Sequence, residues 1–148
     1  MTIDDLLRVH RIEKTCFTDA WPYSLFLNDL EADNTLTYVA AVGRKVVGFI
    51  ICMMVLDELH LTNIAVDPEF QRKKVGHALI EHIFCIGDRY GSKIMYLDVR
   101  KSNDAAINFY RGYGFDVLYE RRGYYRNPPE DALVMGVNLK ERLKSGVV

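Results

Sequence analysis

The sequence predicts a mixed α/β fold in which one mostly antiparallel sheet carries helices on both faces. Residues 36–55 predict two strands joined by a tight turn, which is the pattern of an antiparallel hairpin. From residue 59 onward, short strand-like runs alternate with segments of helical period, as they do in β-α-β units. Antiparallel strands followed by such units form a mixed sheet that needs helices on both sides.

Length and composition place the chain among ordinary globular proteins. Its 148 residues are expected to form one domain over residues 1–148, with a solvated tail after about residue 141. The net charge of −1 offers no electrostatic reason to expect nucleic acid or a membrane as partner. The apolar run Val46–Leu56 is too short to span a bilayer, and no export signal is recognised at the start.

The three cysteines lie in apolar surroundings and lack the C-x-x-C spacing of metal or redox sites. They are predicted to be reduced core residues of a cytoplasmic protein. No cluster of histidine, cysteine and acidic residues has the spacing of a metal site, so no metal is expected. The cysteines are Cys16, Cys52 and Cys85.

Two helices are predicted ahead of the hairpin. The first runs from a cap at Thr2 to about Cys16, and residues 17–22 interrupt it. The second runs from Ser24 to about Ala32. The face of the first helix that points inward is predicted to carry Leu6, Val9 and Ile12. The hairpin strands that follow are Leu36–Val42 and Val46–Val55.

The stretch from Leu59 to Ile86 organises the rest of the chain. Leu59–Val66 predicts a strand, Asp67-Pro68 ends it, and a helix begins at Val75. The apolar face of that helix is predicted to consist of Val75, Ala78, Leu79, Ile83 and Ile86. The cationic loop 71–76 before it is either a phosphate site at a helix N-terminus or simply a solvated charged turn.

The C-terminal half predicts one more helix between three strands. Gly91 is expected to end the long helix, and Ser92–Arg100 forms the next strand. A helix over Asn103–Tyr113 stops at Gly114. The last two strands, Phe115–Tyr124 and Ala132–Leu139, are joined by a turn-rich segment at residues 126–129.

Four motifs in order resemble those of the GCN5-related N-acetyltransferase (GNAT) superfamily. The resemblance is closest to bacterial ribosomal-protein alanine N-acetyltransferases and to archaeal and eukaryotic amino-terminal acetyltransferases. The motifs are Asn63-Ile64-Ala65-Val66-Asp67-Pro68 with Gln71-Arg72, Leu97-Asp98-Val99-Arg100-Lys101-Ser102-Asn103, Ala106-Ile107-Asn108-Phe109-Tyr110 with Gly114-Phe115, and Arg121-Arg122-Gly123-Tyr124-Tyr125 with Glu130-Asp131-Ala132. Together they cover most of the chain from Leu59 to Met135.

The family fold implied by this resemblance is a mixed sheet that splays into a V between the Leu59–Val66 and Ser92–Arg100 strands, with acetyl-CoA as co-substrate in the gap. The strand that usually precedes the first helix in the family is short or missing here. The implied partners are acetyl-CoA and a protein or peptide N-terminus, with a ribosomal protein as one candidate.

The resemblance places acetyl-CoA along the backbone of Ile64, Ala65 and Val66, whose N–H groups would polarise the thioester carbonyl. The alternative for this segment is an ordinary buried strand. The pyrophosphate would lie over the loop and helix start, which comprise Arg72, Lys73, Lys74, Val75, Gly76 and His77. Lys74 stands where the family has a glycine, at a point where a positive φ is expected.

Asn103 has two candidate roles. The resemblance assigns its side chain to the pantetheine arm. As the residue before a predicted helix, it can equally serve as that helix's N-cap.

Three residues are candidates for the proton transfers. Tyr110 matches the family's general acid, although its helical spacing also fits a core aromatic. Asp98 stands where bacterial relatives carry a glutamate base. It can act as the base, hold a water or the amine, or simply pair with Arg100 or another cation. His60 on the neighbouring strand is the alternative base, because its ordinary pKa lies nearer neutrality; the other reading is a structural or solvated histidine.

Acceptor contacts are expected from two loops. The first, residues 17–23, contributes Trp21 and Tyr23, and the second, before the last hairpin turn, contributes Tyr124 and Tyr125. Their rings would narrow the entrance while the hydroxyls bond peptide backbone; alternatively they close the end of the sheet.

An N-terminal α-amine suits this chemistry. Its ordinary pKa of about 7.7–8.0 leaves roughly a tenth of it neutral at pH 7, whereas a lysine near 10.4 is almost wholly charged. The sequence therefore predicts an acetyl-CoA-dependent protein N-terminal acetyltransferase acting by direct attack. A lysine or small-amine acetyltransferase of the same fold and a non-catalytic acyl-CoA-binding protein remain the alternatives, and ribosome association is left open.

Overall fold

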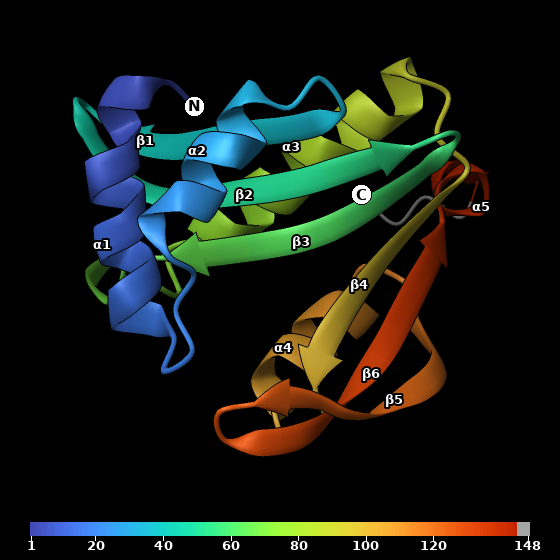
Figure 1. Ribbon diagram of the computed structural model, residues 1–148. Helices are drawn as coiled ribbons and strands as arrows, with labels where there is room; N and C mark the ends of the chain where they lie inside the picture. Colours follow the sequence, from blue (N-terminus) through green and yellow to red (C-terminus); the bar gives the residue numbers. More distant parts are fainter. Residues whose placement is uncertain (145–148) are drawn as a thin grey trace.

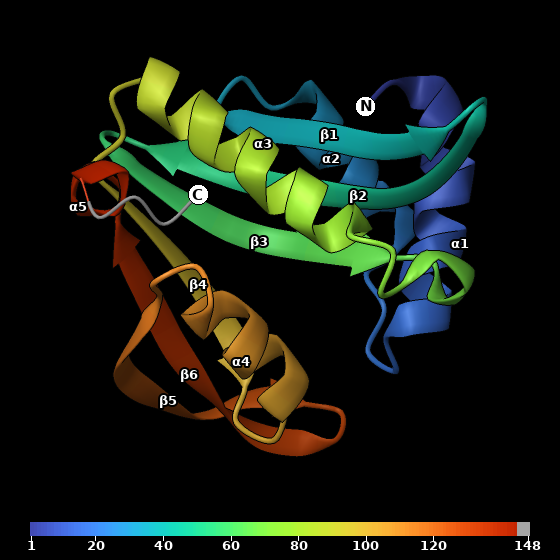
Figure 2. The ribbon, with the colours of Figure 1, turned by 180° about the vertical axis from the view of Figure 1, so that it is seen from behind.

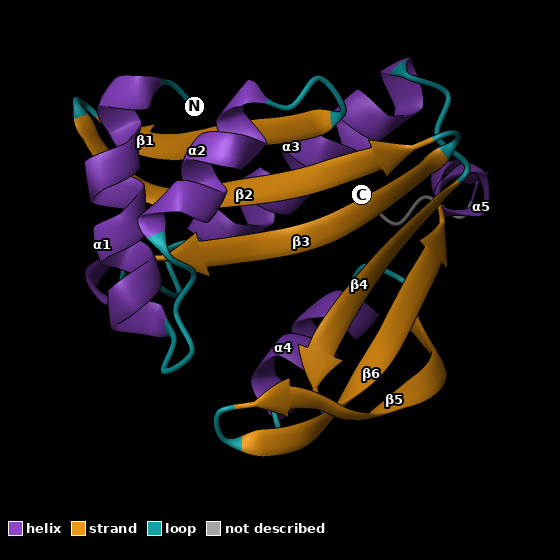
Figure 3. Ribbon diagram, viewed as in Figure 1, coloured by secondary structure: helices purple, strands orange, loops and turns teal. Residues whose placement is uncertain are grey.

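The computed structural model describes residues 1–144 and contains one six-stranded sheet with helices on both faces (Figure 1). The helical elements are η1 (Ile3–Asp5), α1 (Leu6–Cys16), α2 (Tyr23–Glu31), η2 (Pro68–Phe70), α3 (Val75–Arg89), α4 (Asp104–Arg111) and α5 (Leu139–Lys144). The strands are β1 (Thr35–Val42), β2 (Lys45–Val55), β3 (Glu58–Val66), β4 (Ile94–Arg100), β5 (Asp116–Arg126) and β6 (Pro129–Asn138). Figure 3 shows the same elements coloured by type.

The strand order is β1-β2-β3-β4-β6-β5, and β3 and β4 form the parallel pair. All the other neighbours are antiparallel. The parallel pairing runs only from Glu58↔Ile94 to Leu61↔Leu97. Beyond it the two strands diverge, as Figure 1 shows. The mixed sheet and its V-shaped splay are therefore confirmed.

Helices α1 and α2 cover one face of β1–β3, while α3 lies on the opposite face and α4 lies against β4 and β6 (Figures 1 and 2). One buried cluster joins α1 and α2 to the sheet and includes Leu6, Val9, Ile12, Phe26 and Phe49. The larger cluster joins α3 and α4 to the other face and includes Leu79, Ile83, Met95, Ile107 and Phe115. The predicted inward face of α1 is confirmed.

A β-bulge in β3 was not predicted. On β2 the partners Ile51 and Cys52 are consecutive, whereas they pair with Asn63 and Leu61, so Thr62 is the extra residue. A bulge residue reverses which face the following side chains point to. Leu61 therefore packs in the α3 cluster, whereas Ala65 packs in the α1 cluster. The bulge stands where β3 parts from β4.

Three expectations were wrong in detail. Cys85 is exposed on α3 and does not lie in the core. Ala78, which was predicted on the apolar face of that helix, is also exposed, whereas Ile80 is buried. The chain end predicted as strand and solvated tail instead forms α5, in which Arg142 is buried, stacks on Phe84 and pairs with Glu81 at 2.9 Å. The part of the predicted tail at residues 145–148 lies outside the described residues.

Met1 and Thr2 precede η1 directly. The Met1 ammonium group donates to the Thr37 carbonyl at 3.0 Å and so lies beside β1. None of the helices in residues 1–144 combines the length and apolar character needed to cross a membrane.

Candidate active site

A cleft of about 620 Å³ opens where β3 and β4 separate. Its walls come from the middle of β3, the end of β4, the loop after α1, the start of α4 and the end of β5. The residues that line it are Glu13, Phe17 to Pro22, Leu61 to Ile64, Leu97 to Arg100, Asn103, Ala106, Tyr110 and Tyr124 to Arg126. Segments far apart in the sequence therefore meet at the mouth of the V.

Asp98 lines this cleft from β4. Its Oδ1 atom lies 3.5 Å from Nε of Arg121 and accepts no hydrogen bond from any described residue. Burial raises the pKa of Asp98 above its ordinary value, although the positive charges of Arg121 and His60 pull it down. The predicted pairing with a cation is thus present, but with Arg121 and not with Arg100. A carboxylate with a raised pKa and a free lone pair is suited to accept a proton.

His60 lies at the closed end of the V. It is opposite Tyr96 in the parallel pairing, and its ring centroid is 5.4 Å from that ring. Its Nε2 atom is 3.1 Å from Oε2 of Glu58. His60 does not line the cleft, so the structure brings Asp98 and not His60 to the cleft surface.

Tyr110 on α4 has only 7% of its surface exposed and lines the cleft. Its ring packs edge-on against Phe109 and Phe115, so the core role foreseen for it is real. Within residues 1–144 its hydroxyl has no hydrogen-bond partner. Burial raises the pKa of the phenol, which keeps it protonated. The same side chain can thus serve the core and hold a proton at the cleft.

Asn103 is the N-cap of α4, because its Oδ1 accepts from the Ala106 N–H at 3.1 Å. This confirms the capping role. The residue also lines the cleft, and its amide NH₂ group has no partner among the described residues. Capping uses only the oxygen, so the two candidate roles are compatible.

The loop before α3 has a strained backbone and carries cationic side chains. Arg72 has φ 58° and Lys74 has φ 64°, both in the left-handed region that glycine prefers. Arg72, Lys73 and Lys74 are all exposed, and Lys74 is the N-cap of α3. When right-handed and left-handed backbone conformations alternate along a loop, successive N–H groups point to one side and form a concave anion site. The positive φ expected at Lys74 is therefore present.

Val75, Gly76 and His77 form the first turn of α3. A Cβ at Gly76 would lie 3.7 Å from Phe109 and 3.9 Å from Val66, so the position tolerates a small side chain sterically. His77 is exposed on α3; its Nδ1 is 2.6 Å from the Tyr113 hydroxyl and its ring packs on Phe109.

Ile64, Ala65 and Val66 pair with β2 on one side, opposite Ile50, Phe49 and Gly48. On the other side β3 has left β4, since that pairing ends at Leu61. Alternate backbone groups of a strand point to opposite sides. Some N–H groups of this segment therefore face the splay, and Ile64 itself lines the cleft.

Three of the four predicted acceptor residues line the cleft, namely Trp21, Tyr124 and Tyr125. The fourth, Tyr23, starts α2 and packs against His10 with ring centroids 5.7 Å apart, so it does not reach the cleft lining. Arg100 lies 4.2 Å over the Tyr125 ring. Burial raises the pKa of Tyr125 to about 12.

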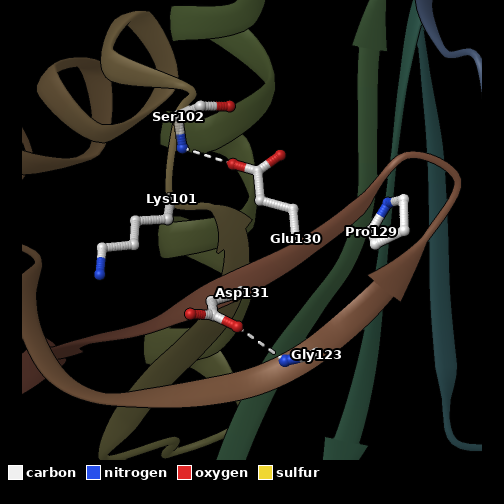
Figure 4. Close-up of a pocket in the computed structure, with 6 residues that line it drawn as sticks. All are labelled: Lys101, Ser102, Gly123, Pro129, Glu130 and Asp131. Carbon is white, nitrogen blue, oxygen red and sulfur yellow. Dashed lines mark hydrogen bonds between the residues drawn. The ribbon is translucent and has the colours of Figure 1, made fainter.

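The hairpin that carries the two tyrosines is held by two acidic side chains of β6 and by Arg100 of β4. Glu130 accepts from the Ser102 N–H at 2.6 Å and Asp131 accepts from the Gly123 N–H at 2.7 Å, around a surface hollow of about 550 Å³ (Figure 4). Arg100 donates to the carbonyls of Asn127 and Pro128 at 2.9 Å each. These contacts fix where Tyr124 and Tyr125 stand.

Glu13 is a cleft residue that the sequence motifs did not single out. Glu13 is 1% exposed and lines the cleft from α1. The signal was available, because Glu13 follows Leu6 and Val9 at helical spacing on the inward face. In the part of the chain that the structure describes, no three histidine, cysteine or acidic residues are grouped so that they could hold a metal ion.

The known proteins and structures compared with this chain below are acetyltransferases or resemble one in fold. Residues 6–115 match the model of the acetyltransferase (GNAT) family. The [ribosomal protein bS18]-alanine N-acetyltransferase of Escherichia coli K12 is 36% identical over 135 residues, 90% of either chain. The crystal structure of the E. coli ribosomal-protein-S18-alanine N-acetyltransferase superposes with a TM-score of 0.88 at 34% identity, covering 94% of this chain and 90% of that one. Ard1 from Thermoplasma volcanium superposes with a TM-score of 0.85 at 29% identity, covering 93% of each chain.

Proposed function

This chain belongs to the acetyltransferase (GNAT) family, which makes it an acyltransferase, and we propose that it moves the acetyl group of acetyl-CoA to the N-terminal α-amine of a protein or peptide. The observation that carries the proposal is the cleft at the splay, which brings the Asp98 carboxylate and the Tyr110 phenol to one surface. The similar bS18-alanine N-acetyltransferases make an N-terminal alanine of a ribosomal protein the first acceptor to test.

In this mechanism the acetyl group is transferred in one direct attack, without a covalent enzyme intermediate. Asp98 accepts the proton of the α-amine, directly or through a water, because its raised pKa makes it a stronger base than an ordinary aspartate. Backbone N–H groups of Ile64 to Val66 stabilise the developing oxyanion. Tyr110 then donates its proton to the departing thiolate. His60 is the alternative proton acceptor.

Acetyl-CoA is proposed to lie with its pyrophosphate against Arg72 to His77 and its pantetheine arm near the Asn103 amide. The exposed cations and left-handed backbone of the loop support the first assignment, and the unused NH₂ group supports the second. The acceptor N-terminus is proposed to enter between Trp21 and the Tyr124–Tyr125 pair. The three free thiols fit a reducing compartment, and we place the reaction in the cytoplasm.

The test of this function is thiol release from acetyl-CoA in the presence of matched peptides. A peptide with a free N-terminal alanine should be acetylated, whereas the same sequence with a blocked N-terminus and an internal lysine should not. Mass spectrometry locates the added acetyl group. Modification of the lysine alone would assign the enzyme to side-chain amines, and release with no peptide would leave only binding or hydrolysis of the thioester.

Lys74→Gly separates strain from charge in the cofactor loop. A non-glycine residue at φ 64° costs roughly 1 kcal/mol, so glycine should raise the melting temperature by a few degrees. If the Lys74 charge binds phosphate, calorimetry with acetyl-CoA should nevertheless show weaker binding. Gly76→Asp is the contrasting variant, because it adds a negative charge that would repel the pyrophosphate, with little steric conflict. Equal acetyl-CoA affinity in Gly76→Asp would remove the pyrophosphate from this loop.

A further inference from the structure

The buried acid on α1 is unusual for its surroundings. Glu13 lies between apolar residues of the α1 cluster and is almost wholly excluded from solvent. Burying a carboxylate is unfavourable unless hydrogen bonds replace the water it loses. Glu13 takes no part in the proposed proton transfers, and it lies at the wall of the acceptor cleft. Its contacts therefore call for another role.

Each carboxylate oxygen of Glu13 accepts one hydrogen bond. Oε1 accepts from the backbone N–H of Trp21 at 2.9 Å, and Oε2 accepts from Nδ2 of Asn63 at 3.0 Å. The three residues belong to α1, to the loop between α1 and α2, and to β3. One side chain thus ties the acceptor loop to the strand that borders the cleft.

The contact with β3 depends on the bulge at Thr62. Without the extra residue, Asn63 would share a face with Leu61 and point toward α3. The bulge turns the Asn63 amide to the α1 side, where it meets Glu13. Asn63 immediately precedes Ile64, whose backbone is part of the proposed oxyanion site. The loop is consequently anchored beside the reaction centre.

Few other contacts hold the middle of this loop. Phe17, Thr18 and Asp19 are exposed. In the described residues, Trp21 N–H to Glu13 is the one hydrogen bond made by the loop between Thr18 and Trp21. The Trp21 ring adds a contact with Phe26 at 5.8 Å between centroids. The position of the loop backbone therefore depends mainly on the Glu13 carboxylate.

We infer that Glu13 is a positioning residue for the acceptor: through Trp21 and Asn63 it holds the loop of residues 17–22 at the distance from Tyr124 and Tyr125 that admits a peptide N-terminus. This role rests on the proposed function. Glu13 touches no reacting atom, so its loss should affect peptide binding first. Acetyl-CoA binding, which uses the other side of the splay, should change little.

The informative variants exchange the two hydrogen-bonding groups. Glu13→Gln leaves one acceptor oxygen for the Trp21 N–H, but its new NH₂ group faces the Asn63 amide. The charge-assisted bond to Asn63 is lost, and only a weaker amide–amide bond, with the Asn63 amide turned over, can replace it. The double variant Glu13→Gln/Asn63→Asp restores it, because the new amide donates to the new carboxylate. Burial disfavours the charged form of Glu13 by raising its pKa, so the neutral variant is expected to fold.

Trp21 supplies a direct readout, since it is the single tryptophan of the chain. Acrylamide quenching of its fluorescence should increase in Glu13→Gln and return to the wild-type value in the double variant. The KM for an alanine-starting peptide should rise about tenfold in the single variant, the size expected for losing one hydrogen bond to a charged group. The double variant should recover it. The acetyl-CoA affinity should stay within about twofold throughout.

Glu31→Gln is the matched control, because it removes one negative charge from an exposed position at the end of α2. It should leave the acrylamide quenching of Trp21 and the KM values for the peptide and for acetyl-CoA unchanged. If Glu13→Gln does not fold, Asn63→Ala tests the same bond from the other partner and should shift both readouts in the same direction.

Unchanged quenching and unchanged peptide KM in Glu13→Gln, or no recovery in the double variant, would overturn the positioning role. An equal loss of peptide and acetyl-CoA affinity would do the same, since it indicates general loosening of the fold. If the wild type acetylates no peptide but quenching still follows the exchange, the proposed function fails while the anchoring of the loop stands.

Discussion

Tyr110→Phe is expected to lower kcat by about a hundredfold to ten thousandfold, the usual contribution of a general acid or base. The substitution removes the hydroxyl and keeps the ring, so the packing against Phe109 and Phe115 is preserved. No hydrogen bond to another residue within 1–144 is lost. The melting temperature and the acetyl-CoA affinity should therefore stay close to those of the wild type. Single-turnover kinetics measures the chemical step directly.

Tyr38→Phe is the matched control for this experiment. Tyr38 is a partly buried tyrosine on β1 that packs against His82, with ring centroids 4.5 Å apart, away from the cleft. Its variant should keep the wild-type rate. An unchanged single-turnover rate in Tyr110→Phe would reduce Tyr110 to a core aromatic and leave the thiolate to be protonated by water.

Asp98→Asn is expected to lower kcat/KM for a peptide by about a hundredfold across the pH range, because an amide cannot accept the amine proton. In the wild type, kcat/KM should fall toward acid pH as Asp98 is protonated. Burial raises the pKa of Asp98, so this limb should lie above the ordinary value of 3.8. The asparagine variant should lose that limb, leaving only the titration of the substrate amine.

His60→Phe distinguishes the second candidate base. If His60 accepts the proton, its variant should remove an acidic limb from the pH profile of kcat/KM. Asp98 lines the cleft and His60 does not, which favours a small effect of His60→Phe. Wild-type rates and profiles in both single variants would exclude both residues, and the reaction would then use the neutral fraction of the α-amine.

Asp98→Asn also has an expected effect on stability. A carboxyl whose pKa is higher in the folded than in the unfolded state favours folding while it is protonated. That contribution is full below the unfolded pKa and is lost as the pH rises through the folded pKa. At neutral pH the charge of Asp98 therefore opposes folding, and thermal unfolding should show a melting temperature of Asp98→Asn no lower than that of the wild type. A clear decrease would mean that the Arg121 ion pair outweighs burial.

The sequence indicated many of the residues that line the cleft, but it did not indicate how they are arranged there. Asp98, Tyr110, Asn103, Trp21 and the two tyrosines of β5 all line the cleft. The motif order does not reveal that Tyr23 packs against His10 or that His60 is absent from the cleft lining. Tyr23 lies on α2 and His60 lies where β3 is still paired with β4, so both outcomes depend on how separate elements pack. Spacing within one segment does not determine contacts between segments.

Local signals determined the elements of this protein: periodicity set the strands and helices, Gly43 and Gly91 marked turns at positive φ, and Asp67-Pro68 ended β3. Lys74 in place of a glycine correctly predicted a left-handed residue. Only the tertiary structure decided the bulge at Thr62, the hydrogen bond between Glu13 and Asn63, and the docking of α5. The physical reason is that each of these depends on partners distant in sequence, Ile51, Asn63 and Glu81, whose positions are settled by packing and not by local conformational preference.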